Sequence, residues 1–362
     1  MKPRHEWWVC FYIILVIAVP VAFTSTRVKE ERPRVAVEGN ETFPSMHYVV
    51  AGKASPRPLE GGSASEPLKD PSPGGYTWSL SMWLVPMMVM LVGLMRNLKG
   101  NFEPLKALFW VSLLLGLLGL LLDMIFGNLF FTFPNREAIA GPCLPALTWG
   151  GAGYENQWWS ADLIPWEEYG FYYFGSVTIV MIYVWGNEYW FAAYRSAGNR
   201  CEKKEFLAFF RWGRFHLTPI IAGVLLFSFG CFWRYGVMGR EDGFPGYLLF
   251  LVLIGVVPSV FLYHLVERHI NFRALSATFV MTLLVSVFYE VVLGMPYQWW
   301  GYRDEQMMGL PINGFSGVPL EQPLLWVAIA WAGVVFYETA LTLRAWGWGN
   351  IREMMREHFR VQ

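Results

Sequence analysis

Ile164-Pro165-Trp166-Glu167-Glu168 begins an apolar stretch that runs from residue 163 to 191, and Val318-Pro319-Leu320-Glu321-Gln322 begins a second one from 318 to 343. Each is longer than the roughly 20 apolar residues that a helix needs to cross the hydrocarbon core of a bilayer. Proline suits the first turn of a helix, where its missing N–H would have no partner anyway. The two segments therefore predict membrane-spanning helices that begin at a Pro-x-Glu sequence.

Further apolar stretches surround these two. They occupy residues 7–23, 78–95, 107–133, 215–233, 245–266 and 274–294. The chain of 362 residues is 55% hydrophobic and only 15% charged, whereas soluble domains are about 25% charged. We therefore expect an all-α, polytopic membrane protein with about eight transmembrane helices.

The composition also excludes several classes of protein. The chain carries 28 basic and 28 acidic residues, so it lacks the positive charge of a nucleic-acid-binding protein. Its cysteines are scattered, without the spacing of a zinc site or of a disulfide framework. The sequence has no glycine-rich nucleotide-binding motif. We expect no nucleic acid, no metal and no organic cofactor, and the sequence does not indicate an oligomeric state.

Lysine and arginine in the short loops indicate how a membrane protein is oriented, because they accumulate on the cytoplasmic side. With the N-terminus in the cytoplasm, the cytoplasmic segments hold 17 of these residues and the short outer loops hold 4. The long segment 24–77 holds the rest and is discounted. We therefore expect an integral protein of the plasma (inner) membrane with both termini cytoplasmic.

The apolar stretches and their loops divide the chain into units. Residues 24–77 are rich in proline, glycine and serine, which predicts a flexible outer linker. Residues 1–23 form a membrane anchor or a signal peptide, and the poor cleavage site at its end favours an anchor. The units expected after the linker are a first repeat at 78–194, a basic loop and connecting helix at 195–243, a second repeat at 244–346 and a basic cytoplasmic tail at 347–362.

The two repeats share several features. Glu167 and Glu321 each lie two residues after a proline, and a tyrosine follows each glutamate by 16 residues. The preceding helices carry Asp123 and Glu290, each 16 residues from the helix start. This spacing predicts a tandem repeat of a three-helix unit. One extra helix between the copies gives both the same orientation in the membrane, which is a parallel repeat.

The four acids lie at a common depth in the expected bilayer. At about 1.5 Å of rise per residue, Asp123, Glu290, Glu167 and Glu321 all fall in its outer third. An acid inside a spanning helix is costly and usually faces a polar cavity. An interhelical hydrogen bond would also account for Asp123 or Glu290. Glu167 and Glu321 could instead serve only the helix start, where a carboxylate complements backbone N–H groups.

Acids beside aromatic rings in an apolar pocket suit carbocation chemistry on a polyene. Burial and a neighbouring carboxylate favour the protonated form of a carboxyl group, which can protonate an alkene. Aromatic faces stabilise the resulting cation, and a second carboxylate can remove a proton. The aromatic residues expected above the acids are Trp158, Trp159, Trp299 and Trp300. The aromatic belt at a membrane interface would explain these tryptophans as well.

The segment Pro165-Trp166-Glu167-Glu168-Tyr169-Gly170-Phe171-Tyr172 resembles the Pro-x-Glu-(Glu/Asp)-x-x-Phe-Phe signature of the membrane lycopene cyclases of the heterodimeric or fused type. The second copy, from Trp300-Gly301-Tyr302 to Trp326, resembles their second half. The run from Tyr289-Glu290 through Gly294-Met295-Pro296 to Trp326 is also similar to the related carotenoid hydratases. The resemblance covers about residues 78–346.

This resemblance implies ring closure at the end of lycopene without net redox change. It makes Glu167 and Glu168 the acid pair of the first half and Glu321 the single acid of the second. The intramembrane Asp123 and Glu290 complete the catalytic candidates. The candidates for substrate binding are Trp158, Trp159, Trp166, Trp299, Trp300 and Tyr302. The implied partners are a hydrophobic polyene or isoprenoid substrate and membrane lipid.

The sequence departs from the family pattern at two positions that bear on activity. Gln322 stands where the second acid of the second half is expected, and Gly170 stands where a bulky apolar residue is usual. Three other functions fit the same sequence. They are a carotenoid hydratase, a proton- or cation-coupled transporter with acids at a repeat interface, and a non-catalytic membrane protein with a cyclase-like domain. Acids near one membrane face, rather than at the midplane, count against transport.

Overall fold

The computed structural model of the chain is mostly helical. The described residues are 34–37, 46–49, 74–98, 100–133, 138–149, 158–195, 217–241, 243–295, 299–312, 315 and 317–347. The expected span at 7–23, most of the expected linker at 24–77 and the tail after residue 347 lie outside this part of the chain. Residues 75–77 of the expected linker are helical.

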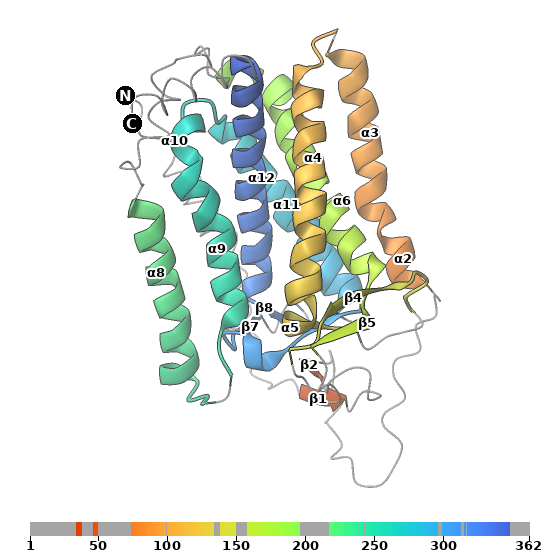
Figure 1. Cartoon of the computed structure of the whole chain (residues 1–362), viewed down its shortest axis with the longest axis vertical. Helices are drawn as coiled ribbons and strands as arrows, with labels where there is room; N and C mark the ends of the chain where they lie inside the picture. The colour runs from red at the N-terminus through yellow and green to blue at the C-terminus, as the bar shows by residue number, and fades with distance from the viewer. Residues whose placement is uncertain are drawn as a thin grey trace.

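Long helices form the body of the molecule (Figure 1). They are α3 (Ser81–Asn97), α4 (Glu103–Leu122), α6 (Trp166–Trp185), α8 (Leu217–Cys231), α9 (Gly246–Phe261), α11 (Phe272–Phe288) and α12 (Glu321–Trp346). The short helices α2 (Gly75–Ser79), α5 (Asn128–Phe130) and α10 (Tyr263–Val266) flank them. Each apolar stretch expected from residue 78 onward overlaps one of the long helices, and its ends agree to within a few residues when the π-helical turns and short helices that continue the long ones are included.

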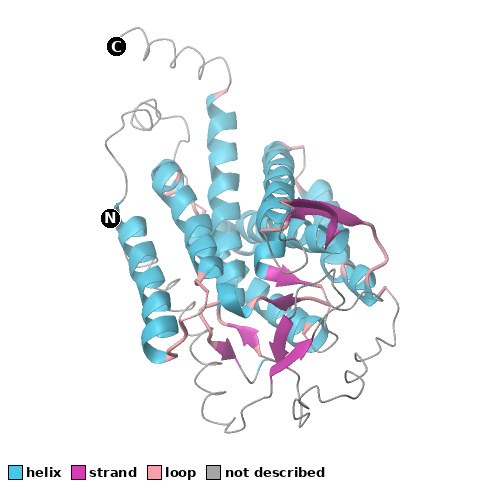
Figure 2. Cartoon of the chain, turned by 60° about the horizontal axis from the view of Figure 1, so that its bottom comes forward, coloured by secondary structure: helices cyan, strands magenta, loops and turns pink. Residues whose placement is uncertain are grey.

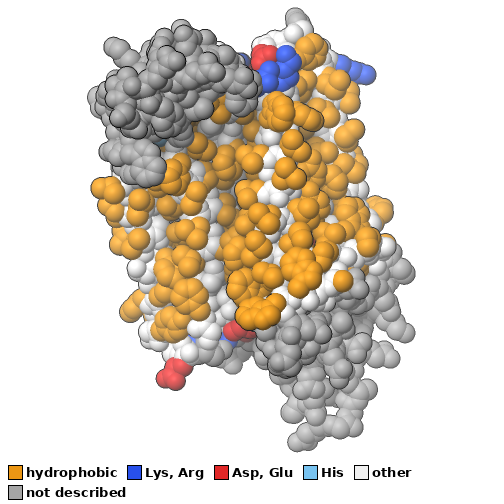
Figure 3. Space-filling model, viewed as in Figure 1, with side chains coloured by type: hydrophobic (Ala, Val, Ile, Leu, Met, Phe, Trp, Pro, Cys, Tyr) orange, Lys and Arg blue, Asp and Glu red, His pale blue; other side chains and the backbone are white. Residues whose placement is uncertain are grey.

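Five described helical segments are long and apolar enough to cross a membrane. They are Gly75–Arg96, Glu103–Phe130, Leu217–Val237, Phe272–Val291 and Glu321–Trp346. The helices lie side by side (Figure 1), and the face in Figure 3 is covered with hydrophobic side chains. Exposed apolar residues are numerous on α3, α4 and α8, including Val89, Leu117 and Leu225, whereas soluble proteins rarely expose large contiguous apolar patches. This surface is consistent with a membrane protein whose helices face lipid.

The core lies along α6 and α12, which pack directly on each other. In the most apolar 18 residues of the segment Glu321–Trp346, which contains α12, 61% are buried. The corresponding share is 17% in the peripheral segment Leu217–Val237, which contains α8. Small residues permit the close approach, as they do between membrane helices generally. A Cβ on Gly333 would lie 2.8 Å from Val180 Cγ2, and one on Gly175 would lie 3.2 Å from the Trp326 ring. Larger residues at either glycine would therefore separate the two helices.

Strands gather at one end of the helices (Figure 2). All four strand pairs are antiparallel: β1 (Arg34–Val37) with β2 (Met46–Val49), β3 (Phe131–Thr132) with β6 (Gly301–Tyr302), β4 (Cys143–Leu147) with β5 (Trp159–Pro165), and β7 (Pro311–Ile312) with β8 (Val318–Pro319). The all-α expectation missed these strands. Most are too short to leave a periodic pattern in the sequence.

Part of the order of elements is shared by residues 74–195, which we call the first half, and residues 243–347, which we call the second half. In each, a long helix leads into a π-helical turn, a short strand, a hairpin and a long helix that begins near a proline. The π-helical turns are η1 (Asp123–Gly127) and η6 (Tyr289–Gly294). The short strands of the two halves, β3 and β6, pair with each other. Turns of this kind often occur at functional sites.

Candidate active site

Three carboxylic acids come together at the end of the bundle that carries the strands. Asp123 begins η1, Glu168 lies in the first turn of α6, and Glu290 lies in η6. All three side chains are buried. Glu168 interacts electrostatically with both Asp123 and Glu290, so acids from both halves share one site. All three residues are catalytic candidates from the sequence.

Glu290 is fully engaged by hydrogen-bond donors. Its Oε1 accepts from Gln322 Nε2 at 2.8 Å and from Trp326 Nε1 at 2.7 Å. Its Oε2 accepts from the Tyr302 hydroxyl at 3.1 Å. Burial raises the pKa of Tyr302 well above its usual range, and the nearby Glu290 adds to this rise, so the hydroxyl stays protonated and able to donate. Glu290 therefore belongs to a buried network in which three donors hold both oxygens of its carboxyl group.

Equivalent tyrosines contact equivalent positions in the two halves. The Tyr76 hydroxyl donates to Glu168 Oε2 at 2.5 Å, and the Tyr247 hydroxyl donates to Gln322 Oε1 at 2.9 Å. Glu168 and Gln322 each follow the Pro-x-Glu glutamate directly. The first half thus contains a carboxyl pair, Glu168 beside Asp123, where the second half contains a neutral amide bonded to Glu290.

Asp123 differs from Glu290 in having an unused acceptor atom. The side chain is 7% exposed, and its Oδ2 has no hydrogen-bond partner among the described residues. Asp123 also lines a cavity of about 220 Å³ between the helices. None of the other four candidate acids lines this cavity. Asp123 is therefore the carboxyl group in the described part of the chain that a bound molecule in this cavity would meet.

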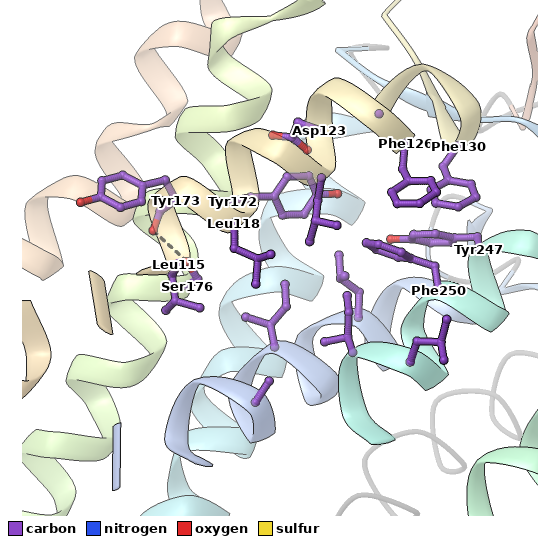
Figure 4. A pocket seen from close by; sticks show the side chains of 18 of the residues that line it. Leu115, Leu118, Asp123, Phe126, Phe130, Tyr172, Tyr173, Ser176, Tyr247 and Phe250 are labelled. Atoms are coloured by element: carbon purple, nitrogen blue, oxygen red, sulfur yellow. Dashed lines mark hydrogen bonds between the residues drawn. The ribbon is translucent and has the colours of Figure 1, made fainter. Parts of the chain in front are cut away.

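The cavity is almost entirely apolar. Around Asp123 it is lined by aromatic side chains, namely Phe126, Phe130, Phe131, Tyr172, Tyr247 and Phe250. Figure 4 shows the rings of Phe126, Phe130, Tyr247 and Phe250 grouped together, with Asp123 and Tyr172 nearby. Mostly aliphatic residues of α4, α9 and α12 line the remainder, together with Tyr173 and Ser176 of α6 and Phe336 of α12. Such a site suits a hydrophobic ligand whose reacting end lies between one carboxyl group and several aromatic faces.

Glu167 and Glu321 are buried, but they bind the loops. Glu167 Oε1 accepts from the backbone N–H groups of Ala140 at 3.0 Å and Gly141 at 2.8 Å, and from the Thr77 hydroxyl. Glu321 accepts from the backbone N–H of Met308. Both glutamates therefore fasten a loop to the start of a long helix. For Glu167 these donors belong to a loop and not to its own helix, so the contacts differ from the helix-start role that the sequence suggested.

The structure separates the aromatic candidates into two groups. Trp299 and Trp300 are buried against Tyr76, at ring centroid distances of 5.8 and 5.2 Å, and Tyr302 contacts Glu290. In contrast, Trp158 is 77% exposed and Trp159 is 46% exposed. Both therefore lie at the surface, whereas the carboxyl groups are buried.

Trp166 is half-buried at the start of α6. Its ring occupies the space that a Cβ on Gly141 would need. Trp166 thus packs against the loop that Glu167 fastens, and it does not line the cavity.

Several site residues carried no signal in the sequence. Tyr76 lies in the segment expected to be a linker, and Tyr172, Tyr247, Tyr289 and Trp326 lie among many other aromatic residues. Tyr289 stacks on Phe171 at 4.8 Å and shares a 2.6 Å hydrogen bond with Ser79. The spacing of Tyr172 and Trp326, each four residues after Glu168 or Gln322, could have marked them, because such residues share a helix face.

No group of histidine, cysteine and acidic residues that could hold a metal ion occurs in the described residues. No protein-family model, no curated protein and no solved structure matches the chain.

Proposed function

We propose that this protein is a membrane-embedded terpenoid cyclase of the lycopene cyclase type, which closes a ring at one end of a linear polyene. The observation that carries the proposal is the carboxyl group of Asp123, which lies at an aromatic-lined, otherwise apolar cavity. The chemistry needs a proton donor, a water-poor site and aromatic faces for the cation, and it needs no redox cofactor.

In the proposed reaction, Asp123 transfers its proton to the last double bond of the polyene. A C–H bond forms, and the positive charge falls on the branched carbon. The next double bond donates its electron pair to this carbon, so a ring closes and the charge moves to another branched carbon. The carboxylate then removes a proton beside that carbon, which leaves a ring double bond. The product is an isomer of the substrate, and Asp123 regains its proton.

Glu168 supports this cycle as the neighbour of Asp123. Two buried carboxylates that interact repel each other, so we assign one shared proton to the pair of Asp123 and Glu168. Tyr76 fixes Glu168 by its 2.5 Å hydrogen bond, and Tyr172 interacts with Glu168 while also lining the cavity. These contacts favour Asp123 over Glu167 as the acid that meets the substrate, since Glu167 is occupied with the loop at 140–141.

The proposal includes eight transmembrane helices, both termini in the cytoplasm and a parallel tandem repeat. The shared order of elements, the equivalent Tyr76 and Tyr247 contacts and the antiparallel pairing of β3 with β6 support the repeat. Only the first half retains a carboxyl pair. Because Gln322 and Trp326 occupy Glu290, we expect a single reacting site and products with a ring at one end.

The test is expression in a bacterial host that accumulates lycopene, with pigments separated by chromatography and weighed by mass spectrometry. Ring closure leaves the mass of lycopene unchanged and shortens its chromophore. Asp123→Asn removes the transferable proton with little change in size, and loss of one general acid typically costs about 10²–10⁴-fold in rate. Glu103→Gln, on the same helix but in an exposed ion pair with Arg344, is the matched control.

Two outcomes would reject this function. Unchanged lycopene in cells that contain well-expressed, folded protein would point to a non-catalytic role or another terpenoid. Full activity of Asp123→Asn would remove the assigned acid even if cyclisation occurred. A product heavier by one water would instead assign carotenoid hydration, in which water captures the same cation.

A further inference from the structure

The cavity at Asp123 is a groove with one open side. Helices α4 and α9 both pack on α12, which forms the floor. The lining residues Leu118, Leu253 and Val257 are 36%, 49% and 47% exposed. They belong to α4 and α9, so the groove opens to the outside between these two helices. We call this opening the α4–α9 seam. In a membrane, this side faces lipid, as the apolar surface in Figure 3 does.

The groove is elongated along the helix axes. On α12 its lining runs from Leu325 to Phe336, and on α9 from Tyr247 to Pro258. Eleven steps of helix at about 1.5 Å each correspond to a length of roughly 16 Å. Asp123 and the cluster of Phe126, Phe130, Tyr247 and Phe250 lie toward one end of this length, and mostly aliphatic side chains line the rest (Figure 4). A slot of this shape fits a linear hydrocarbon chain that lies parallel to the helices.

Gly119 leaves open space on the α4 side of the groove, because it has no side chain. It lies one helical turn before Asp123 and lines the cavity. A Cβ on Gly119 would meet no atom within 4 Å, so no packing requirement within the described residues demands a glycine there. Glycine in the middle of a helix is less favourable than alanine, because it loses more conformational freedom on folding. The residue therefore gives up helix stability while keeping open space beside the acid.

We propose that a linear isoprenoid chain enters sideways from the bilayer through the α4–α9 seam, and that Gly119 sets the width of this passage. The end of the chain reaches Asp123, whose unpartnered, buried Oδ2 terminates the groove. The remaining chain lies on α12 between α4 and α9. The hydrocarbon class of this ligand rests on the proposed function, whereas the route and the role of Gly119 follow from the shape of the groove.

The experiment measures lycopene binding apart from turnover. Purified protein in lipid nanodiscs is titrated with lycopene, whose polyene quenches tryptophan fluorescence. Trp149, which stacks on the groove residue Phe126 at 6.1 Å, is one such reporter. Gly119→Leu narrows the seam from α4, and Val257→Phe narrows it from α9. Gly255→Leu is the control, because a Cβ there also meets no atom within 4 Å and the residue does not line the groove.

We expect Gly119→Leu and Val257→Phe each to bind lycopene about tenfold more weakly than the wild type. The new side chain occupies space that the bound hydrocarbon needs, and overpacking of this kind typically costs about this much. Gly255→Leu should bind as the wild type does. Circular dichroism and thermal unfolding verify that each variant is folded. If only one of Gly119→Leu and Val257→Phe folds, its lycopene binding is sufficient to test the proposed route. Equal binding by wild type, seam variant and control would overturn the route, as would absence of binding to the wild type.

The result separates this inference from the proposed function. Weak binding by the seam variants, together with no ring product from the wild type in cells, would retain the groove and reject cyclisation. Normal ring formation by a folded Gly119→Leu variant would retain cyclisation and reject the groove as the route to Asp123.

Discussion

Tyr76 and Glu168 are 92 positions apart in the chain, and the hydroxyl of Tyr76 donates a 2.5 Å hydrogen bond to the carboxyl of Glu168. The bond ties the short helix before α3 to the start of α6. It also holds the second acid of the proposed pair in place beside Asp123. Tyr247 makes the equivalent contact to Gln322 in the second half.

Tyr76→Phe should reduce both stability and product formation. The substitution removes a donor from a buried carboxyl oxygen, and such a loss typically costs about 1–3 kcal/mol. Tyr247→Phe should destabilise the protein to a similar or smaller degree, but it should leave more of the ring product, because Gln322 does not belong to the acid pair. Thermal unfolding in detergent and pigment yield per folded protein provide the two readings. Equal yields from both variants would contradict a special role for the first half.

Glu167→Gln should act mainly on the loop at 140–141. The amide can accept through its oxygen, but it loses the charge that strengthens the hydrogen bonds from Ala140 and Gly141. We expect a lower unfolding temperature and a partial loss of product, in contrast to the near-complete loss in Asp123→Asn. A variant with normal stability and no activity would indicate that Glu167, and not Asp123, is the proton donor.

Gln322→Glu should make stability depend on pH. The new carboxyl would lie about where Gln322 Nε2 now donates to Glu290 Oε1 at 2.8 Å. At low pH one of the two groups carries a proton and can donate to the other. At high pH both are ionised and repel, so stability should fall as the pH rises. Unfolding temperatures at pH 5 and pH 8, with wild type as reference, test this. A variant no more pH-sensitive than the wild type would argue against a dry, closed site around Glu290.

The proposed topology can be tested in a background without native cysteines. Glu241, in the exposed loop before α9, is expected outside, and Asn101, in the exposed loop before α4, is expected in the cytoplasm. A Glu241→Cys protein in intact cells should react with an impermeant maleimide, and an Asn101→Cys protein should react only after lysis. The opposite pattern would invert the orientation, and labelling of both in intact cells would rule out the arrangement of helices between them.

The long helices could be placed from sequence because a bilayer demands about 20 apolar residues for each crossing. That requirement leaves a signal strong enough to locate α3, α4, α11 and α12 to within a few residues. The strands left no such signal, since β3, β6, β7 and β8 are only two residues long. They form where loops of distant segments meet, and no local pattern specifies such pairing.

The acids of the candidate site could be predicted from the sequence, but the groups that each acid contacts could not. Asp123 and Glu290 stood out because carboxyl groups inside apolar helices are rare. The sequence did not show that Glu167 and Glu321 bind backbone N–H groups, because every loop offers such donors. Trp158 and Trp159 looked equivalent to Trp299 and Trp300, yet only the second pair is buried. The partners of a tryptophan in a loop depend on how that loop folds back.

Helix α8 lies at the edge of the bundle, packs mainly on α9, and carries the chain from the first half to the second. As a covalent tether, it holds the halves at an effective concentration of the order of millimolar or higher. The halves also pack on each other through α4, α6 and α12, and the pairing of β3 with β6 adds only two residue pairs to this interface. A tether also fixes the stoichiometry at one to one. Neither half has to select its partner, so one can keep two acids while the other exchanges one for Gln322.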